Sequence, residues 1–308
     1  IIFNESLSSE QINALYNNRT DLIVAQETEV GDIWQACITP NDGIADGSEN
    51  CSIGLVIKNT PPTPVILISP EDNNITTNRI PSFEWNSTDD DGDAIVYDFN
   101  LTCYNSAGGG CSDDDRFISA TSSTSYTITT FLKYLKDNNY YYNWTVRGSD
   151  DNGVSYGAWA TPRKIEIQAL LNITLTVDSI AFSNVSYPWT DNTTDNSPQP
   201  FELQNDGNSL ANITINATNL WQTVLSTSKY YQYKIDNKTG EEGAFNWILS
   251  DTSWTNLSVN SAEELAIAKL NWSDSSDVAE TDLLIEIPIQ EGPGYKSSTV
   301  YFKAVLGE

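Results

Sequence analysis

The chain has 308 residues, enough for two or three domains, and Trp, Tyr and Phe make up 11% of it. Its net charge of −27 repels the phosphate backbone of nucleic acid and attracts divalent cations, although a high-salt habitat would also favour such a surface. The acids gather in loops, which argues against the latter explanation. Without His, the Ser-His-Asp and Cys-His arrangements are excluded, and we expect no enzymatic activity.

The chain also lacks Met, a signal peptide and any apolar run of the ~20 residues that a membrane span requires. We therefore expect a mature, processed chain or a fragment of a longer protein, with no membrane span in this part.

Residues 1–60 are expected to form four strands and one short helix. The strands are "IIFNES" (1–6), "TDLIVA" (20–25), "GDIWQACIT" (31–39) and "CSIGLVIKN" (51–59). Ser8 and Gln11 form a capping-box pattern, and Ile12, Leu15 and Tyr16 share one face of the helix that follows. Four strands make only part of a β-sandwich, which normally has about seven.

The proline linker "NTPPTP" (59–64) separates this part from two all-β regions. Residues 65–168 contain seven short alternating segments, at 65–70, 81–87, 94–104, 116–120, 125–129, 139–149 and 163–168. Residues 169–308 continue the pattern at 170–177, 210–218, 230–235, 282–290 and 298–305. The sequence thus predicts an all-β fold of tandem β-sandwiches with one short N-terminal helix, divided into 1–60, 61–168 and 169–308.

The four cysteines allow three disulfide connectivities. Cys37 and Cys51 are equidistant from Ile44, and Cys103 and Cys111 from Ala107, so each pair would face across a hairpin. This symmetry favours two local disulfides and an oxidising, extracellular compartment. Four buried thiols are the alternative, and a zinc site made of all four lacks any C-x-x-C spacing.

Two acidic loops carry carboxylates at spacings that suit Ca²⁺, which prefers oxygen ligands. In "STDDDGDA" (87–94) the expected ligands are Asp89, Asp91 and Asp93, while "NDGIADGSE" (41–49) is a weaker candidate. The EF-hand pattern fails in the first loop, because its glycine is misplaced and its twelfth position is Asn100. Solvated turns are the alternative, since Asp and Gly dominate turns. Calcium is the only cofactor that the sequence suggests.

Asn-x-Ser/Thr sequons are the strongest local signal. Composition alone predicts roughly six of them, yet the chain has more than twice that number, spread over all three regions. A polar strand face rich in Asn and Thr generates such triplets automatically, but those in loops need no such pattern. We therefore expect N-glycosylation at these fifteen positions: Asn4, Asn18, Asn50, Asn74, Asn86, Asn100, Asn143, Asn172, Asn184, Asn192, Asn212, Asn216, Asn237, Asn256 and Asn271.

Residues 62–168 resemble a fibronectin type III domain. The likeness rests on "FEWNSTDDDGDAIVYDF" (83–99) and "YYYNWTVRGSDDNGVSYGAW" (140–159), with Trp85 at the place of the family's second-strand core tryptophan. Leu135 and Tyr142 resemble its leucine–tyrosine corner, with a spacing one residue longer than usual. The resemblance implies a sandwich and no activity.

Residues 22–58 resemble the last strands of an immunoglobulin-like module of large archaeal surface proteins, through Trp34 and "TPNDG" (39–43). "IIFNESLSSEQINALYNN" (1–18) resembles the closing strand and helix of a laminin-G-like jelly roll. "FELQNDGNSLANITI" (201–215) and "GYKSSTVYFKA" (294–304) are similar to terminal sandwich modules of such proteins. Together these resemblances imply a multidomain glycoprotein of the archaeal cell surface.

Three functions fit these features. The first is a structural subunit of an extracellular filament, in which copies join head to tail and a donor strand such as "IIF" (1–3) completes the partial N-terminal module. The second is an adhesin or carbohydrate-binding protein that stacks sugars on exposed aromatic rings, although core packing is the commoner role of such residues. The third is a segment of a longer surface stalk. The candidate rings are Trp189, Trp221, Trp247, Trp254 and Trp272.

Overall fold

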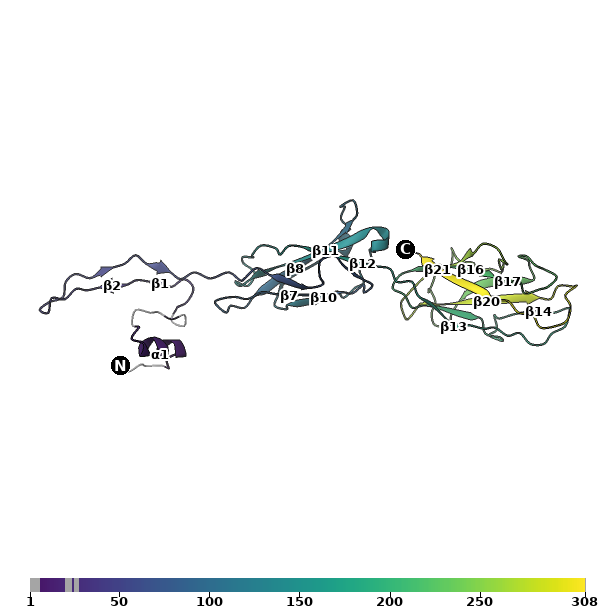
Figure 1. Cartoon of the computed structure of the whole chain (residues 1–308), viewed down its shortest axis with the longest axis horizontal. Coiled ribbons are helices and arrows are strands. Elements are labelled where there is room, and N and C mark those ends of the chain that lie inside the picture. Colours follow the sequence, from purple (N-terminus) through teal and green to yellow (C-terminus); the bar gives the residue numbers. More distant parts are fainter. Residues whose placement is uncertain (1–5, 20–23, 25–27, 308) are drawn as a thin grey trace.

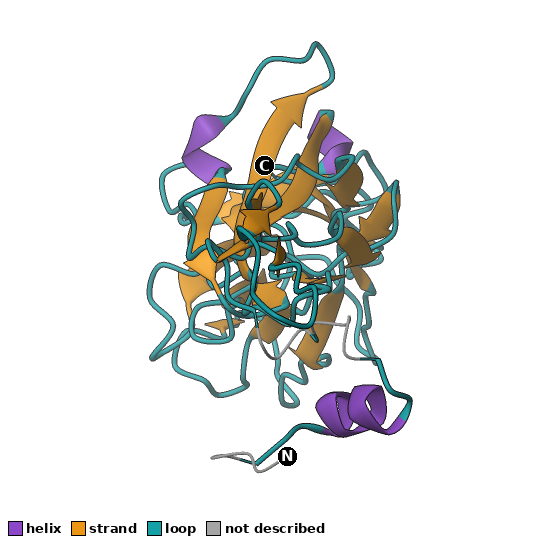
Figure 2. Ribbon diagram, turned by 90° about the vertical axis from the view of Figure 1, so that its left-hand side faces the viewer, coloured by secondary structure: helices purple, strands orange, loops and turns teal. Residues whose placement is uncertain are grey.

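The computed structural model describes residues 6–19, 24 and 28–307, and these form an all-β chain with one short α-helix, α1 (Ser9–Tyr16) (Figure 1). The predicted fold class is thereby confirmed, whereas the immunoglobulin-like and fibronectin-like identities stay predictions. The molecule is elongated, with a thin N-terminal hairpin at one end and a broad sandwich at the other. Viewed along the long axis, α1 lies apart from the strand-rich body (Figure 2).

The N-terminal part begins with the predicted helix. Ser8 Oγ accepts a hydrogen bond from Gln11 N, and Gln11 Oε1 accepts one from Ser8 N, so the capping box is confirmed. Most of the strands expected at 1–6 and 20–25 lies outside the described residues. The two strands expected at 31–39 and 51–59 are interrupted, and they pair with each other in two short ladders. One joins β1 (Ile33–Trp34) to β4 (Leu55–Val56), and the other joins β2 (Cys37–Ile38) to β3 (Asn50–Cys51).

The middle part consists of two antiparallel-rich sheets that pack on one core. The smaller sheet has the order β10 (Ser125–Thr127), β7 (Ser82–Asn86), β5 (Ile66–Ser69). The larger has the order β6 (Asn74–Thr76), β12 (Arg163–Ile167), β11 (Tyr140–Ser149), β8 (Val96–Asn105), β9 (Arg116–Thr121). Two 3₁₀ turns lie at Ser112–Asp114 and Lys136–Asn138. Trp85, Phe99 and Trp144 are almost completely buried between the sheets, as alternation along each strand predicts.

Tyr142 connects β11 to the segment before it. Its hydroxyl accepts a hydrogen bond from Tyr134 N at 3.0 Å and donates to Asp114 Oδ2 at 2.5 Å, next to the fully buried Leu135. Burial and the Asp114 carboxylate raise the pKa of Tyr142 far above its ordinary value. The longer spacing put a corner-type hydrogen bond from Tyr142 in doubt, yet the hydroxyl does bond back to the backbone of Tyr134.

The C-terminal part has a larger and a smaller sheet around a second core. The larger has the order β13 (Ile173–Val177), β15 (Phe201–Asn205), β20 (Val278–Glu286), β17 (Tyr231–Asn237), β18 (Thr255–Asn256), with β14 (Thr190–Asn192) also on β20. The smaller has the order β19 (Glu264–Leu270), β16 (Ala211–Ala217), β21 (Val300–Leu306). Ile213 and Ile215 on β16 are fully buried, as alternation along the predicted strand at 210–218 implies. Four of these strands, β14, β15, β18 and β19, had no counterpart among the predicted segments.

The middle and C-terminal parts are joined by a dense set of contacts. Arg79 is buried and donates to the carbonyls of Leu132, Lys133 and Asn208 at 2.8, 2.7 and 2.7 Å, while its guanidinium stacks over Trp272 at 4.6 Å.

Asn208 reaches back across the same junction. Its Nδ2 donates to Thr77 O at 2.5 Å and to Gln168 O at 3.0 Å, and its Oδ1 accepts from Leu170 N at 2.7 Å. With hydrogen bonds, a cation–π contact and apolar packing in one place, the junction fixes the two sandwiches relative to each other.

Candidate functional site

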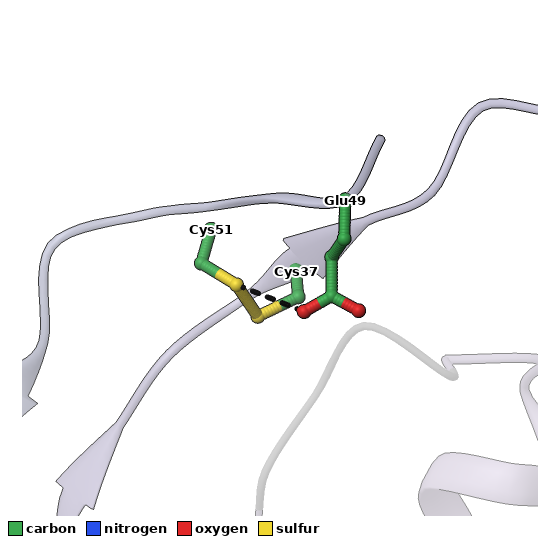
Figure 3. A group of neighbouring side chains, drawn as sticks. All are labelled: Cys37, Glu49 and Cys51. Atoms are coloured by element: carbon green, nitrogen blue, oxygen red, sulfur yellow. Dashed lines mark hydrogen bonds between the residues drawn. A yellow bond between two sulfur atoms is a disulfide. The ribbon is translucent and has the colours of Figure 1, made fainter. Parts of the chain in front are cut away.

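The N-terminal hairpin, residues 31–57, is the most unusual surface of the molecule. The Cys37–Cys51 disulfide closes it, and Cys37 faces Cys51 directly in the β2–β3 ladder (Figure 3). Both predicted disulfides are present, since Cys103 pairs with Cys111 at the end of β8. Glu49 Oε1 lies 3.2 Å from Cys51 Sγ, but a disulfide sulfur carries no proton to donate. The group Cys37, Glu49 and Cys51 is therefore a clamped hairpin and not a set of metal ligands.

The hairpin exposes large apolar side chains on both of its strands. Ile33 is 69% exposed, Leu55 68% and Ile53 93%. Ile38 and Val56 are exposed as well. Among the described residues, neither core cluster includes a side chain from 31–58. An exposed apolar hairpin with unpaired strand edges is a template for pairing with another strand.

The hairpin's register explains why its ladders are short. Trp34 faces Leu55 and Cys37 faces Cys51, so three steps along one strand match four along the other. This extra residue interrupts the ladder. It falls beside Gly54, where an added Cβ would meet Ile33 Cγ2 at 2.6 Å, so a larger residue would require the Ile33 side chain to shift.

Helix α1 adds to the uncovered apolar surface of this part. Ala14 is its buried residue, whereas Ile12, Leu15 and Tyr16, the predicted apolar face, are exposed. Helix and hairpin thus both present the faces that their sequence patterns assign to a core. The donor segment proposed at 1–3 lies outside the described residues.

The predicted calcium ligands lie together at the base of the linker. Oxygens of Asp89, Asp91 and Asp93 all lie within 4.8 Å of one another. Asp89 Oδ1 accepts hydrogen bonds from Asp91 N and Asp93 N, and its Oδ2 is shielded from solvent without a partner among the described atoms. Asp91 Oδ2 accepts from Thr60 N of the linker at 2.8 Å. These hard oxygens would suit Ca²⁺, with water and backbone completing the shell.

The second acidic loop uses its carboxylates to form its own turn. Asp42 Oδ1 accepts from Ile44 N and Ala45 N, and these backbone donors hold the pKa of Asp42 below its usual value. Asp46 Oδ1 accepts from the Asn41 side chain at 2.5 Å. The interpretation as a hydrogen-bonded turn fits these contacts best.

The sequon asparagines that the structure describes all reach the surface at least in part. Asn4 lies outside the described residues. Two sequons are interlocked on neighbouring strands, because Asn100 of β8 faces Thr145 of β11 and Asn143 faces Thr102. The exposed asparagines are Asn18, Asn50, Asn86, Asn172, Asn184 and Asn256, and the half-buried ones are Asn74, Asn100, Asn143, Asn192, Asn212, Asn216, Asn237 and Asn271.

The five candidate tryptophans have different surroundings. Trp221 is a core residue whose Nε1 donates to Tyr230 O at 3.0 Å. Trp272 is covered by Arg79 and Phe131 at the domain junction. Trp189 and Trp254 are half-buried. Trp247 is 46% exposed and is the one that offers a ring to solvent.

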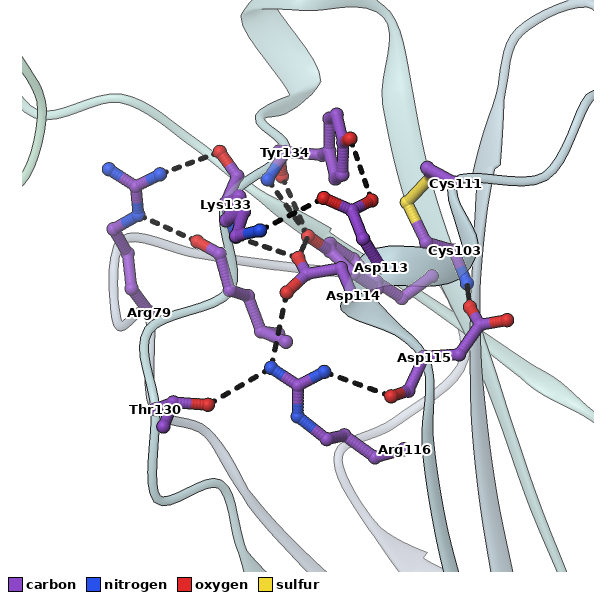
Figure 4. A network of polar contacts seen from close by, with 12 residues as sticks. Arg79, Cys103, Cys111, Asp113, Asp114, Asp115, Arg116, Thr130, Lys133 and Tyr134 are labelled. Carbon is purple, nitrogen blue, oxygen red and sulfur yellow. Dashed lines mark hydrogen bonds and ion pairs between the residues drawn. A yellow bond between two sulfur atoms is a disulfide. The ribbon is translucent and has the colours of Figure 1, made fainter.

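The buried carboxylate Asp114 was not anticipated from the sequence. It is fully buried and accepts from Lys133 N at 2.7 Å and from Tyr142 Oη, and it pairs with Arg116 at 3.2 Å (Figure 4). The carboxylate of Asp113, one residue earlier, instead accepts hydrogen bonds from Lys133 Nζ and Tyr134 Oη at the surface. The network is structural, because it ties the 3₁₀ turn at Ser112–Asp114 to the segment that leads into β11.

In the described part of the chain, no helix is long and apolar enough to cross a membrane.

No family model matches the chain, and no curated protein matches it either. Among solved structures it is similar to α-L-rhamnosidases from Dictyoglumus thermophilum, Aspergillus terreus and Streptomyces avermitilis, with TM-scores of 0.25, 0.26 and 0.26 and identities of 9%, 10% and 13%. The matches cover 81%, 80% and 79% of this chain but only 29%, 27% and 24% of those chains. Such TM-scores assign neither a fold nor an activity to this protein.

Proposed function

We propose that the protein is a structural subunit of an extracellular, N-glycosylated surface filament, in which copies associate and complete the partial N-terminal module by strand addition. The observation that carries this proposal is the disulfide-clamped hairpin with its outward Ile33, Ile53 and Leu55. Burying one large aliphatic side chain contributes about 1.5–3 kcal/mol, so leaving several in water is costly unless a partner covers them.

Two further features support a structural role. The junction at Arg79 and Asn208 holds the middle and C-terminal sandwiches in line, as the subunit of an extended filament needs. Two disulfides and many surface sequons suit an oxidising exterior.

The test uses the full chain with Leu55→Asp and a matched control, Leu225→Asp. Both leucines are exposed to a similar degree, 68% and 63%, but Leu225 lies in a loop of the C-terminal sandwich. Light scattering and electron microscopy across protein concentration, at ~0.5 M salt to screen the charge of −27, should show growing oligomers for the parent and for Leu225→Asp. Leu55→Asp should stay monomeric. A parent chain that is monomeric throughout contradicts the proposal.

A carbohydrate-binding role is a second proposal, favoured by one observation. Trp247 stacks on Phe245 with ring centroids 5.8 Å apart, and the adjoining Ile248 and Leu249 are exposed. An exposed indole ring that a buried phenyl ring holds in place can stack on a sugar face. A glycan array should then show binding that Trp247→Ala abolishes, and an array without any binding by the folded parent contradicts this role.

A further inference from the structure

We propose that the β21 edge of the C-terminal sandwich is the acceptor site for the Cys51–Ile57 strand of a second copy of this chain. This inference rests on the proposed self-assembly and assigns the surface that the hairpin pairs with. The site consists of the unpaired edge of β21 together with the inward face of β13, which lies opposite that edge.

The edge of β21 offers backbone groups in a regular pattern. Thr218 N donates to Thr299 O at one end of the β16–β21 ladder, and Gly307 N donates to Leu210 O at the other. Because hydrogen-bonded pairs alternate in an antiparallel ladder, Tyr301, Lys303 and Val305 bond to β16. The N–H and C=O groups of Val300, Phe302 and Ala304 therefore point the other way, where no described strand pairs with β21.

The side chains of the same residues are incompletely covered. Val300, Phe302 and Ala304 pack against the core of the sandwich but are only partly buried, as are Ile173 and Leu175 of β13. At the opposite edge of the same sheet, the core residues of β19 are buried, among them Ala266, Ile267 and Leu270. The two edge strands of this sheet therefore differ, because the inward side chains of β21 are covered less completely than those of β19.

The reason is a difference in width between the two sheets. Phe302 of β21 contacts Phe201 of β15 edge to face, with ring centroids 5.6 Å apart, so β21 lies opposite β15. Since β13 is one strand further out than β15, it extends past the edge of the smaller sheet. One more strand beside β21 would cover β13 and bond to the outward backbone groups.

The hairpin segment Cys51–Ile57 matches this position in length, pattern and charge. It has the same number of residues as β21, and Ile53, Leu55 and Ile57 alternate as core-facing side chains do. Neither this segment nor β13 carries a charge, and β21 has only Lys303, so pairing brings no carboxylates together in a strongly acidic protein. The Cys37–Cys51 disulfide holds the segment extended before it binds.

A second copy is the occupant that the shape of the molecule favours. The hairpin and the C-terminal sandwich lie at opposite ends of the elongated chain, and the middle sandwich separates them (Figure 1). The hairpin therefore meets the β21 edge of a neighbour. Such a contact joins two different surfaces and repeats along an open fibre.

The experiment is disulfide trapping between two full-length variants that are mixed in equal amounts. One carries Leu55→Cys, and the other carries Val300→Cys, Phe302→Cys or Ala304→Cys in turn, because the register of the new pair is not fixed. The control acceptor is Leu265→Cys on β19, which is 44% exposed at the opposite edge of the same sheet. Circular dichroism checks that every variant folds.

At least one β21 cysteine should give ten-fold more mixed dimer than Leu265→Cys on a non-reducing gel. Equal trapping at both edges overturns the acceptor assignment. The acceptor assignment also fails if neither edge is trapped although light scattering shows association that Leu55→Asp abolishes. In that case the proposed strand addition survives with a different acceptor. If the parent chain does not associate at all, the proposed function fails as well.

Discussion

Substituting Asn208→Ala should uncouple the middle and C-terminal sandwiches. The change removes four side-chain hydrogen bonds. Two cross the junction, from Nδ2 to Thr77 O and Gln168 O, and two lie within the C-terminal part, from Leu170 N and Ser209 Oγ to Oδ1. Each such bond contributes about 0.5–1.5 kcal/mol net, so the loss amounts to about 2–6 kcal/mol. For a domain of roughly 100 residues, 1 kcal/mol shifts the melting midpoint by about 4–8 °C.

Differential scanning calorimetry of the full chain measures this effect. The transition of the less stable sandwich should fall by about 10 °C or more in Asn208→Ala. The control is Asn219→Ala, because Asn219 belongs to the same sandwich and its side chain accepts one exposed hydrogen bond, from Asn260. A midpoint change below about 2 °C in Asn208→Ala, or an equal change in the control, would refute the view that this side chain couples the domains.

Three further results are expected. Replacing Cys103 and Cys111 by Ala together should lower the free energy of unfolding by about 2.5 kcal/mol, as chain entropy predicts for so short a loop, and an unchanged urea midpoint contradicts this. Burial raises the pKa of Glu291, but Lys296 and nearby donors outweigh this effect and lower the pKa to about 2. The contribution of Glu291 to stability is therefore complete above pH ~4.5 and is lost as the pH falls toward 2. Glu291→Gln should flatten the fall of the unfolding free energy over this range, and an unaltered pH dependence contradicts this role of Glu291. If Ca²⁺ binds with a dissociation constant of ~1 mM, a ten-fold higher calcium concentration should raise the unfolding free energy of the parent by about 1.4 kcal/mol. The increase should be much smaller in Asp89→Asn, and equal increases in the two proteins exclude the site.

The sequence predicted those features that depend on local chemistry. The capping box at Ser8 and Gln11 and the two hairpin disulfides require only neighbours in the chain. Strict alternation likewise marked the buried faces of strands such as β11 and β16, where Trp144 and Ile213 have no exposed surface.

Features set by distant parts of the chain were missed. "EELAIAKL" (263–270) consists of good helix formers, yet most of it forms β19 because pairing with β16 buries Ala266 and Ile267. The burial of Asp114 gave no signal, since two of its three partners, Lys133 and Tyr142, lie 19 and 28 residues away in the chain. The half-covered edge of β21 could not be anticipated either, because it depends on the widths of two sheets.

Hydrogen–deuterium exchange of the full chain at rising protein concentration tests the central claim most directly. If copies join by strand addition through the hairpin, the amides of residues 51–57 should become protected as oligomers form, and those of Val300, Phe302 and Ala304 should follow them if β21 is the acceptor. Middle-domain amides in β8 and β11 should not change. Oligomers that form while the hairpin amides exchange as fast as in the dilute monomer would contradict strand addition.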